Sequence, residues 1–243
     1  MISFFLYLFC LSLFICATVD VADAQVVSWA TYKYTNQLWT YVGIPGMGTE
    51  VLAFKNGHTD ANPTIYLSAN FGASWVTYPY QSALVPTYAA FSHDGTVVVA
   101  VSYFGDGWIS LSMNRGRFYL AFNTGYYFQG VACSYSGVIM AAVGTKQYIL
   151  MSTDTGTTWY PKTKSPKTNY WVDIAMSSDA SLIVALHNNV PNGGYLYSST
   201  DIGATWTRQG STPYSWQCVA MTATNSYSGN YLIAAAVTLG EYI

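Results

Sequence analysis

The chain alternates short apolar runs with turns rich in glycine, serine and aspartate, and no segment shows the apolar spacing of an amphipathic helix. One kind of run is an unbroken series of β-branched and small apolar residues, which is typical of a strand buried on both faces. A second kind precedes it and carries a small residue at its centre. The repeated pair predicts strands throughout and an all-β fold. The unbroken runs cover residues 96–101, 138–143, 182–186 and 232–237, and the preceding runs are centred on Ala90, Ala132, Ala175 and Ala220.

An eight-residue frame, Ser-x-Asp-x-Gly-x-x-Trp, follows the predicted third strand of four units. Two copies are complete, two have asparagine in place of aspartate, and one of these ends in tyrosine. The first serines stand at 68, 112, 152 and 199, so the units repeat after 44, 40 and 47 residues. A period of about 45 residues with strand-like content is typical of propeller blades. The frame residues are Ser68, Asn70, Gly72 and Trp75, then Ser112, Asn114 and Gly116, then Ser152, Asp154, Gly156 and Trp159, and finally Ser199, Asp201, Gly203 and Trp206.

The residue types of the frame predict a hairpin tip between the third and fourth strands of each unit. The Asp201 carboxylate can accept hydrogen bonds from backbone N–H groups two residues further on, which imitates a turn. Gly203 supplies a positive φ without a Cβ penalty. Trp206 can pack its ring back under the turn. Each unit is therefore predicted to be a four-stranded antiparallel meander.

The frame resembles the Asp-box, also called the BNR repeat, and the resemblance covers residues 39–243. Known hosts of this motif are β-propellers of the sialidase-like superfamily, including sialidases, xyloglucanases, sortilin-type receptors and the photosystem II stability/assembly factor. In repeat style the chain is most similar to the last two. The resemblance implies an all-β β-propeller whose four-stranded antiparallel blades carry Asp-box hairpins, with about five blades present. It implies no particular activity, because enzymes and non-enzymes alike carry the motif.

The fifth unit has two predicted strands, at residues 216–222 and 231–237, and no frame after them. Two interpretations remain open. In one, the chain is a fragment of a larger propeller, and an open sheet edge promotes self-association. In the other, a strand at residues 26–32 closes the last blade and completes the ring.

Residues 1–24 have the features of a secretory signal peptide, with a nearly unbroken apolar run at 4–19 and a small-x-small cleavage pattern at 22–24. The run is short for a membrane span, which takes about 20 apolar residues, and an uncleaved anchor is the alternative. No later segment has the length and apolarity of a span. Residues 25–243 are therefore predicted to form one propeller domain, secreted to the extracellular space and without a membrane span after signal cleavage.

The charge of the chain limits its class of partner. Charged residues make up 8% of the chain and aromatic residues 17%, with 22 tyrosines. Without Asp20 and Asp23 of the leader, acidic and basic side chains balance. The only basic cluster, Lys162, Lys164 and Lys167, falls on a predicted loop. Nucleic acid is not an expected partner, because its binding depends on neutralising phosphates. An extracellular glycan or protein is expected instead.

No cofactor and no metal ion are predicted. The sequence has no glycine-rich phosphate loop and no nucleophile elbow. His58, His93 and His187 fall in different units without the spacing of a zinc site. Cys133 and Cys218 belong to the third and fifth units and are expected to be free thiols, with a disulfide as the alternative.

Catalytic candidates are few. A sialidase needs three converging arginines, but Arg115 and Arg117 lie in the second frame and Arg208 follows the fourth. A glycosidase of another type needs two carboxyl groups across a cleft. Asp106, in a loop, and Asp173, in the first strand of the fourth unit, remain for this role. As a pair they are similar to the two-aspartate site of xyloglucanases in residue type only.

Aromatic residues near the predicted loops favour binding over catalysis, because recognition residues concentrate on loops held by a rigid scaffold. The preferred hypothesis is a secreted, non-catalytic recognition or scaffolding propeller that binds carbohydrate or protein. The alternative is a glycoside hydrolase-like enzyme acting on a neutral polysaccharide. An assembly factor in an organelle lumen is disfavoured, since the leader does not resemble a transit peptide. The candidate contacts are Tyr103, Trp108, Tyr126, Tyr127, Tyr170 and Trp171, with a packing role in the core as the competing interpretation for Trp171.

Overall fold

The computed structural model describes residues 8–10, 13–15, 39–46, 48, 50–55, 64–79, 86–103, 107–117, 120–165, 170–188, 192–221 and 233–237. Every regular element among them is a β-strand, so the predicted all-β class is confirmed. Within the predicted leader, β1 (Leu8–Cys10) pairs with β2 (Leu13–Ile15). The strand expected at residues 26–32 lies outside the described residues. None of the described segments forms a helix with the length and apolarity needed to cross a membrane.

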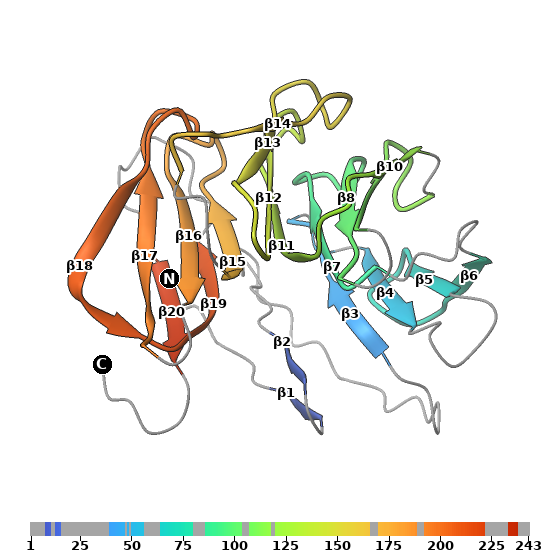
Figure 1. The fold of residues 1–243 in the computed structure, drawn as a ribbon. Helices are drawn as coiled ribbons and strands as arrows, with labels where there is room; N and C mark the ends of the chain where they lie inside the picture. The colour runs from blue at the N-terminus through green and yellow to red at the C-terminus, as the bar shows by residue number, and fades with distance from the viewer. Residues whose placement is uncertain are drawn as a thin grey trace.

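Four sheets of four antiparallel strands follow one another along the chain, and a two-stranded sheet comes last. Strands that are neighbours in sequence are neighbours in each sheet, so the predicted meander is confirmed. Figure 1 shows the sheets side by side in chain order, and we number them blades 1 to 5. Blade 1 comprises β3 (Trp39–Gly43), β4 (Val51–Lys55), β5 (Thr64–Ser68) and β6 (Val76–Pro79); blade 2, β7 (Tyr88–Phe91), β8 (Val98–Val101), β9 (Trp108–Ser112) and β10 (Leu120–Asn123); blade 3, β11 (Phe128–Cys133), β12 (Met140–Gly144), β13 (Leu150–Ser152) and β14 (Tyr160–Pro161); blade 4, β15 (Tyr170–Met176), β16 (Ile183–Asn188), β17 (Gly194–Ser199) and β18 (Thr207–Tyr214); and blade 5, β19 (Trp216–Met221) and β20 (Ile233–Val237).

The first strands of the five blades lie next to one another. β3 contacts β7, β7 contacts β11, β11 contacts β15, and β15 contacts β19. Four of these strands carry an aromatic residue near their start, and the pairing register shifts directly after it, at Trp39, Phe128, Trp171 and Trp216. Such a shift is a β-bulge, which bends the strand and changes the direction of its side chains. The sequence predicts the aromatic residues but not the bulges.

The apolar core lies between successive blades. The second strands β8, β12 and β16 are buried along their whole length, as their unbroken apolar runs predict. One cluster joins Leu52 and Phe54 of blade 1 to Val98 of blade 2, and another joins Met151 of blade 3 to Ile174 of blade 4. Because buried apolar surface contributes about 25 cal/mol per Å², contact between blades is a main source of stability.

A fixed set of hydrogen bonds closes the hairpin frame. In blade 4, the Ser199 hydroxyl accepts the N–H of Gly203 (2.8 Å) and donates to the Asp201 carboxylate (2.8 Å). Asp201 in turn accepts the backbone N–H (2.8 Å) and the hydroxyl (2.6 Å) of Thr205. The indole N–H of Trp206 donates to the Gly203 carbonyl (3.2 Å). The predicted turn is present, but the aspartate binds the residue four positions on, not two.

The other three frames share the first of these hydrogen bonds. The N–H groups of Gly72, Gly116 and Gly156 donate to the first serine of their frames at 2.8, 3.0 and 2.9 Å. The residue before the glycine also has a positive φ, which the sequence does not predict for side chains larger than glycine. The hydrogen bonds of the frame offset the cost of this conformation. These residues are Phe71 (58°), Arg115 (51°), Thr155 (58°) and Ile202 (53°).

We expect Asp201→Ala to lower the melting temperature at pH 7, and Asp201→Asn to lower it less, because the amide oxygen keeps the hydrogen bonds but not the charge. Asn70 already fills this position in blade 1, where its side-chain oxygen accepts the N–H of Ser74 (2.8 Å). The Thr205 hydroxyl, followed by the Thr205 N–H, lowers the pKa of Asp201 from 3.8 to about 2. The carboxylate therefore stabilises the fold above pH 3.8, and this contribution is lost as the pH falls towards 2.

Thermal unfolding of the three proteins at pH 7 and at about pH 2 checks this expectation. Wild type and the asparagine variant should converge at the acidic pH, because the protonated carboxyl and the amide are both neutral acceptors. An asparagine variant that melts as early as the alanine variant at pH 7 would contradict the role of the side-chain oxygen as an acceptor.

Candidate ligand-binding face

Each blade has two ends with different connections. Because the strands are antiparallel, the first turn and the hairpin frame lie at one end, which we call the hairpin end. The loop between the second and third strands and the connection to the next blade lie at the other, the loop end. Backbone hydrogen bonds between loops of neighbouring blades align these ends, for example from Phe128 to Ser102 at the loop end (3.4 Å). The predicted contacts Tyr103, Tyr126, Tyr127 and Tyr170 all lie at the loop end of blades 2 to 4.

Exposed tyrosines follow one another across this loop end. The ring centroids of Tyr103 and Tyr127 are 5.9 Å apart. Thr145 joins Tyr127 to Tyr170, since its N–H donates to the Tyr127 carbonyl (2.9 Å) and its backbone pairs with Tyr170. The exposed fractions are 37% for Tyr103, 52% for Tyr127 and 49% for Tyr170. We call Tyr88, Tyr103, Tyr127 and Tyr170 the tyrosine row.

Tyr88 is a member of the row that sequence reasoning missed. It is 37% exposed at the start of β7. Burial, followed by the charges of Asp173 and Tyr103, raises the pKa of its phenol, so these three groups interact electrostatically. Alignment of the first strands places Tyr88 of blade 2 where blade 3 has Gly130, but it does not indicate that the side chain is exposed.

The loop that precedes Tyr127 is tightly held. The hydroxyl and the N–H of Thr124 donate to the Gly107 carbonyl at 2.6 and 2.9 Å. Gly107 has a φ of 66°, and a Cβ at this position would overlap the Tyr126 carbonyl. The Trp108 carbonyl accepts the N–H of Ser102 (3.0 Å). The loop therefore holds Tyr126, which is 41% exposed, in a defined position beside the row.

Two predicted aromatic contacts differ from the row in burial. Trp108 is half-buried at the start of β9. Trp171 is completely buried, its indole N–H donates to the Gln147 carbonyl (3.2 Å), and its ring meets the edges of His187 and Tyr197. Trp171 therefore packs in the core of blade 4 and is not part of the exposed face, which corrects its assignment as a ligand contact.

Asp173 lies at the junction of blades 3, 4 and 5. One carboxylate oxygen accepts the N–H of Ile174 (2.8 Å), and the other accepts the N–H of Val219 in blade 5 (2.8 Å). A Cβ on Gly130 of blade 3 would lie 2.9 Å from the Asp173 carboxylate. Burial raises the pKa of Asp173 to about 7, although its two backbone hydrogen bonds act in the opposite direction. In this position the carboxyl group ties neighbouring blades together.

Of the two aspartates that the sequence offers as a catalytic pair, the structure describes only Asp173. Asp106 lies outside the described residues, so the separation of Asp106 and Asp173 stays untested. The described residues contain no group of three or more histidine, cysteine, aspartate and glutamate side chains placed to hold a metal ion. Cys133 and Cys218 are not joined by a disulfide bond, and burial raises the pKa of Cys133 to about 12.

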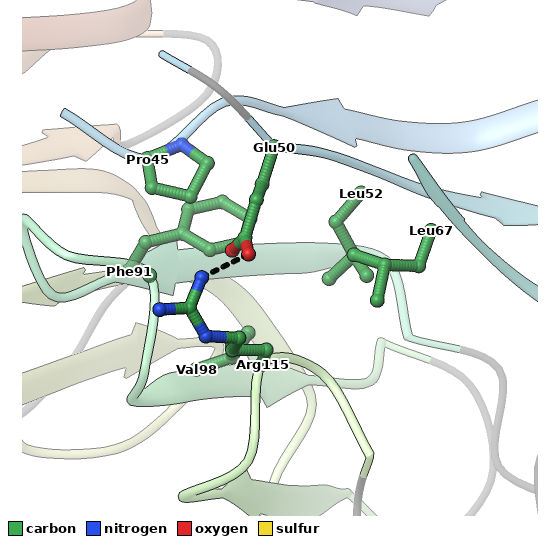
Figure 2. A pocket seen from close by; sticks show the side chains of 8 residues that line it. Pro45, Glu50, Leu52, Leu67, Phe91, Val98 and Arg115 are labelled. Atoms are coloured by element: carbon green, nitrogen blue, oxygen red, sulfur yellow. Dashed lines mark hydrogen bonds and ion pairs between the residues drawn. The ribbon is translucent and has the colours of Figure 1, made fainter. Parts of the chain in front are cut away.

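A small depression lies at the hairpin end between blades 1 and 2. Figure 2 shows Glu50 and Arg115 facing one another there, joined by an ion pair, with Pro45 and Phe91 beside them. Its cavity volume is about 10 Å³, far below the roughly 300–1,000 Å³ of small-molecule sites. We therefore interpret it as a contact between two blades. The other two arginines are also engaged: Arg117 lies over the ring of Tyr78, and Arg208 over that of Tyr195.

Solved structures of low sequence identity share this architecture. The GH74 enzyme of Niastella koreensis matches with a TM-score of 0.59 and 17% identity, over 73% of this chain and 31% of that chain. The GH74 xyloglucanase from Xanthomonas campestris matches with a TM-score of 0.59 and 15% identity, over 84% and 37%. A chain of a nidogen/laminin complex matches with a TM-score of 0.58 and 13% identity, over 82% and 72%. No family model and no curated protein matches the sequence.

At these identities the likeness concerns the fold alone, and the chain spans about a third of the length of the two GH74 enzymes. Together with the observed meanders, it defines the class of protein. The chain is an all-β protein of the β-propeller class, with four complete blades and two strands of a fifth in its described residues.

Proposed function

We propose that this protein is a secreted, non-catalytic recognition propeller that binds carbohydrate through the tyrosine row. The observation that carries the proposal is the line of exposed rings of Tyr103, Tyr127 and Tyr170 across three blades. Aromatic faces pack against the apolar faces of sugar rings while tyrosine hydroxyls form hydrogen bonds. The hydrogen bonds of Thr124 and Thr145 hold the loops in place, which lowers the entropic cost of binding.

Several further assignments accompany this proposal. The hairpin frames, in which the hydrogen bonds of serine, aspartate and glycine recur, support membership of the Asp-box family. The apolar leader at residues 1–24 supports export through a cleaved signal peptide, with residues 25–243 as the propeller domain. The sheet of blade 5 has two described strands, and its outer edge offers a route to self-association.

We expect Tyr127→Ala and Tyr170→Ala each to weaken glycan binding about tenfold, equivalent to ~1.4 kcal/mol. Tyr160→Ala is the matched control, because Tyr160 is 63% exposed but lies on the outer strand β14. Isothermal titration against a panel of neutral and acidic polysaccharides measures the effect. Equal weakening by the control, or binding only of a protein partner, would refute the proposed site.

A glycoside hydrolase is the second candidate, favoured by the likeness to two GH74 enzymes at the level of fold. The two backbone hydrogen bonds of Asp173 support a structural role for its carboxyl group instead. Hydrolysis of a neutral polysaccharide by wild type, abolished in both Asp106→Asn and Asp173→Asn, would establish the enzyme and reject the non-catalytic proposal.

A further inference from the structure

Lys146 lies in the loop between β12 and β13, between two residues that are themselves held in place. On one side, Thr145 donates to the Tyr127 carbonyl and pairs with Tyr170. On the other side, the Gln147 carbonyl accepts the indole N–H of Trp171 (3.2 Å). The backbone of Lys146 is therefore fixed beside the backbones of two members of the tyrosine row, Tyr127 and Tyr170.

The backbone of Lys146 is also strained. Its φ is 58°, a left-handed conformation that costs a residue other than glycine about 1 kcal/mol. The side chain is exposed, and no ion pair or side-chain hydrogen bond of Lys146 is present among the described residues. Backbone strain that no local interaction offsets is concentrated at functional positions.

The loop after β14 places two further lysines near this site. The N–H of Lys162 donates to the Ile149 carbonyl (2.8 Å), and the N–H of Ile149 donates to the Ser165 hydroxyl (3.3 Å). These bonds fasten the loop to the segment that carries Lys146. Lys164, in the same loop, is exposed. We call Lys146, Lys162 and Lys164 the lysine group.

Most of the carboxylates that the structure describes lie at the opposite end of the blades. Five of the described carboxylates lie in first turns or hairpin frames, at the hairpin end, and the sixth, Asp173, is bonded to backbone N–H groups. The described part of the loop end therefore combines exposed aromatic rings with exposed positive charge. The five carboxylates belong to Glu50, Asp94, Asp154, Asp179 and Asp201.

We propose that the tyrosine row binds an acidic glycan and that the lysine group, led by Lys146, recognises its carboxylate or sulfate groups. This inference rests on the proposed function and names the ligand class of the same site. Sugar rings pack on the tyrosine faces, and the ammonium groups form charge-assisted hydrogen bonds with anionic groups at the ring edges. A carboxylate and a sulfate ester present the same chemistry to a lysine.

The test compares short oligogalacturonates with their fully methyl-esterified forms, which keep the sugar backbone and remove the charge. A sulfated galactan oligomer distinguishes sulfate from carboxylate. Lys146→Asn removes the charge and suits the left-handed conformation, and Lys146→Arg keeps the charge. Arg117→Gln is the control, because it removes one positive charge at the hairpin end. Thermal unfolding confirms that each variant is folded.

By isothermal titration at low salt, we expect an acidic oligomer to bind wild type about tenfold or more tightly than the ester. Lys146→Asn should reduce this difference, leaving the share of Lys162 and Lys164, whereas Lys146→Arg and Arg117→Gln should preserve it. Raising the salt concentration from about 0.05 to about 0.5 M should weaken the acidic ligand alone.

Equal affinity for acid and ester, or an unchanged preference in Lys146→Asn, would overturn this inference while leaving carbohydrate binding intact. Failure of every glycan to bind, or binding of a single-stranded polynucleotide in their place, would overturn the proposed function as well.

Discussion

Replacing Asp173 with asparagine is expected to stabilise the protein at pH 8 and to remove part of its pH dependence. Burial at the blade junction raises the pKa of this carboxyl group from 3.8 to about 7. A pKa raised in the folded state means that the folded protein binds the proton more tightly than the unfolded chain does. The stability contributed by Asp173 is therefore complete below pH 3.8 and is lost as the pH rises towards 7.

The size of the effect follows from this shift. Moving a pKa from 3.8 to about 7 corresponds to about 4 kcal/mol, at 1.36 kcal/mol per unit. Asp173 is not completely buried, which reduces the penalty of its charge. Asparagine also loses one of the two backbone hydrogen bonds, worth about 1 kcal/mol. We expect a net gain in the free energy of unfolding of about 2 kcal/mol at pH 8, disappearing near pH 4.

Urea unfolding of wild type and variant at several pH values between 4 and 8 measures this difference. The carboxyl groups of Asp154 and Asp201 have pKa values lowered to about 2, so they do not titrate in this range. The pKa values of Tyr41 and Tyr88 are raised above 10, and these phenols stay neutral. A variant less stable than wild type at pH 8 would show that the hydrogen bonds of the carboxylate outweigh the cost of its burial.

The hairpin frame is predictable because its chemistry is local. Ser199, Asp201, Gly203 and Trp206 lie within eight residues of one another, and each bonds another member or its neighbour. The four-stranded meander follows from the same short range, since each strand pairs with the next along the chain. Fold class and strand order are therefore encoded in patterns that one sequence displays.

The contacts between blades are less predictable, because they depend on which residue the neighbouring blade presents. Gly130 is small because Asp173 of the next blade lies against it. The side-chain amide of Asn188 forms two hydrogen bonds with the backbone of Trp216 in blade 5, at 2.7 and 2.9 Å. No local pattern indicates either contact.

The bulges explain why the candidate site is only partly predictable. Tyr170 is exposed and its neighbour Trp171 is buried, as in a regular strand, but the register shifts before Asp173. The regular alternation of buried and exposed side chains therefore fails to predict burial at the loop end, where the first strands begin. Lys146 was missed for another reason: its importance comes from Thr145, which joins it to tyrosines of two other segments.

Gly203→Ala is expected to destabilise the protein by about 3 kcal/mol, combining backbone strain with overpacking. Gly203 has a φ of 72°, and a Cβ at this position would overlap the sulfur of Met151 in blade 3. Met151 is 1% exposed within the core shared by blades 3 and 4, so it has little room to move. The hairpin glycine is thus needed for contact between blades as well as for its own turn. A Cβ on Gly116 would lie 2.8 Å from Leu52 of blade 1, and a Cβ on Gly156 would lie 3.2 Å from Leu111 of blade 2.

Gly72→Ala is the matched control, because Gly72 holds the same position in the frame of blade 1. Its φ is 84°, and among the described residues a Cβ there would meet Trp75 of its own frame alone, at 3.7 Å. We expect a loss of about 1 kcal/mol from the backbone conformation alone. Chemical denaturation of both variants separates the two contributions, since the difference between them reports the contact with Met151. Equal losses would mean that Met151 moves aside freely, and that the hairpin glycine serves its own turn and not the joint between blades.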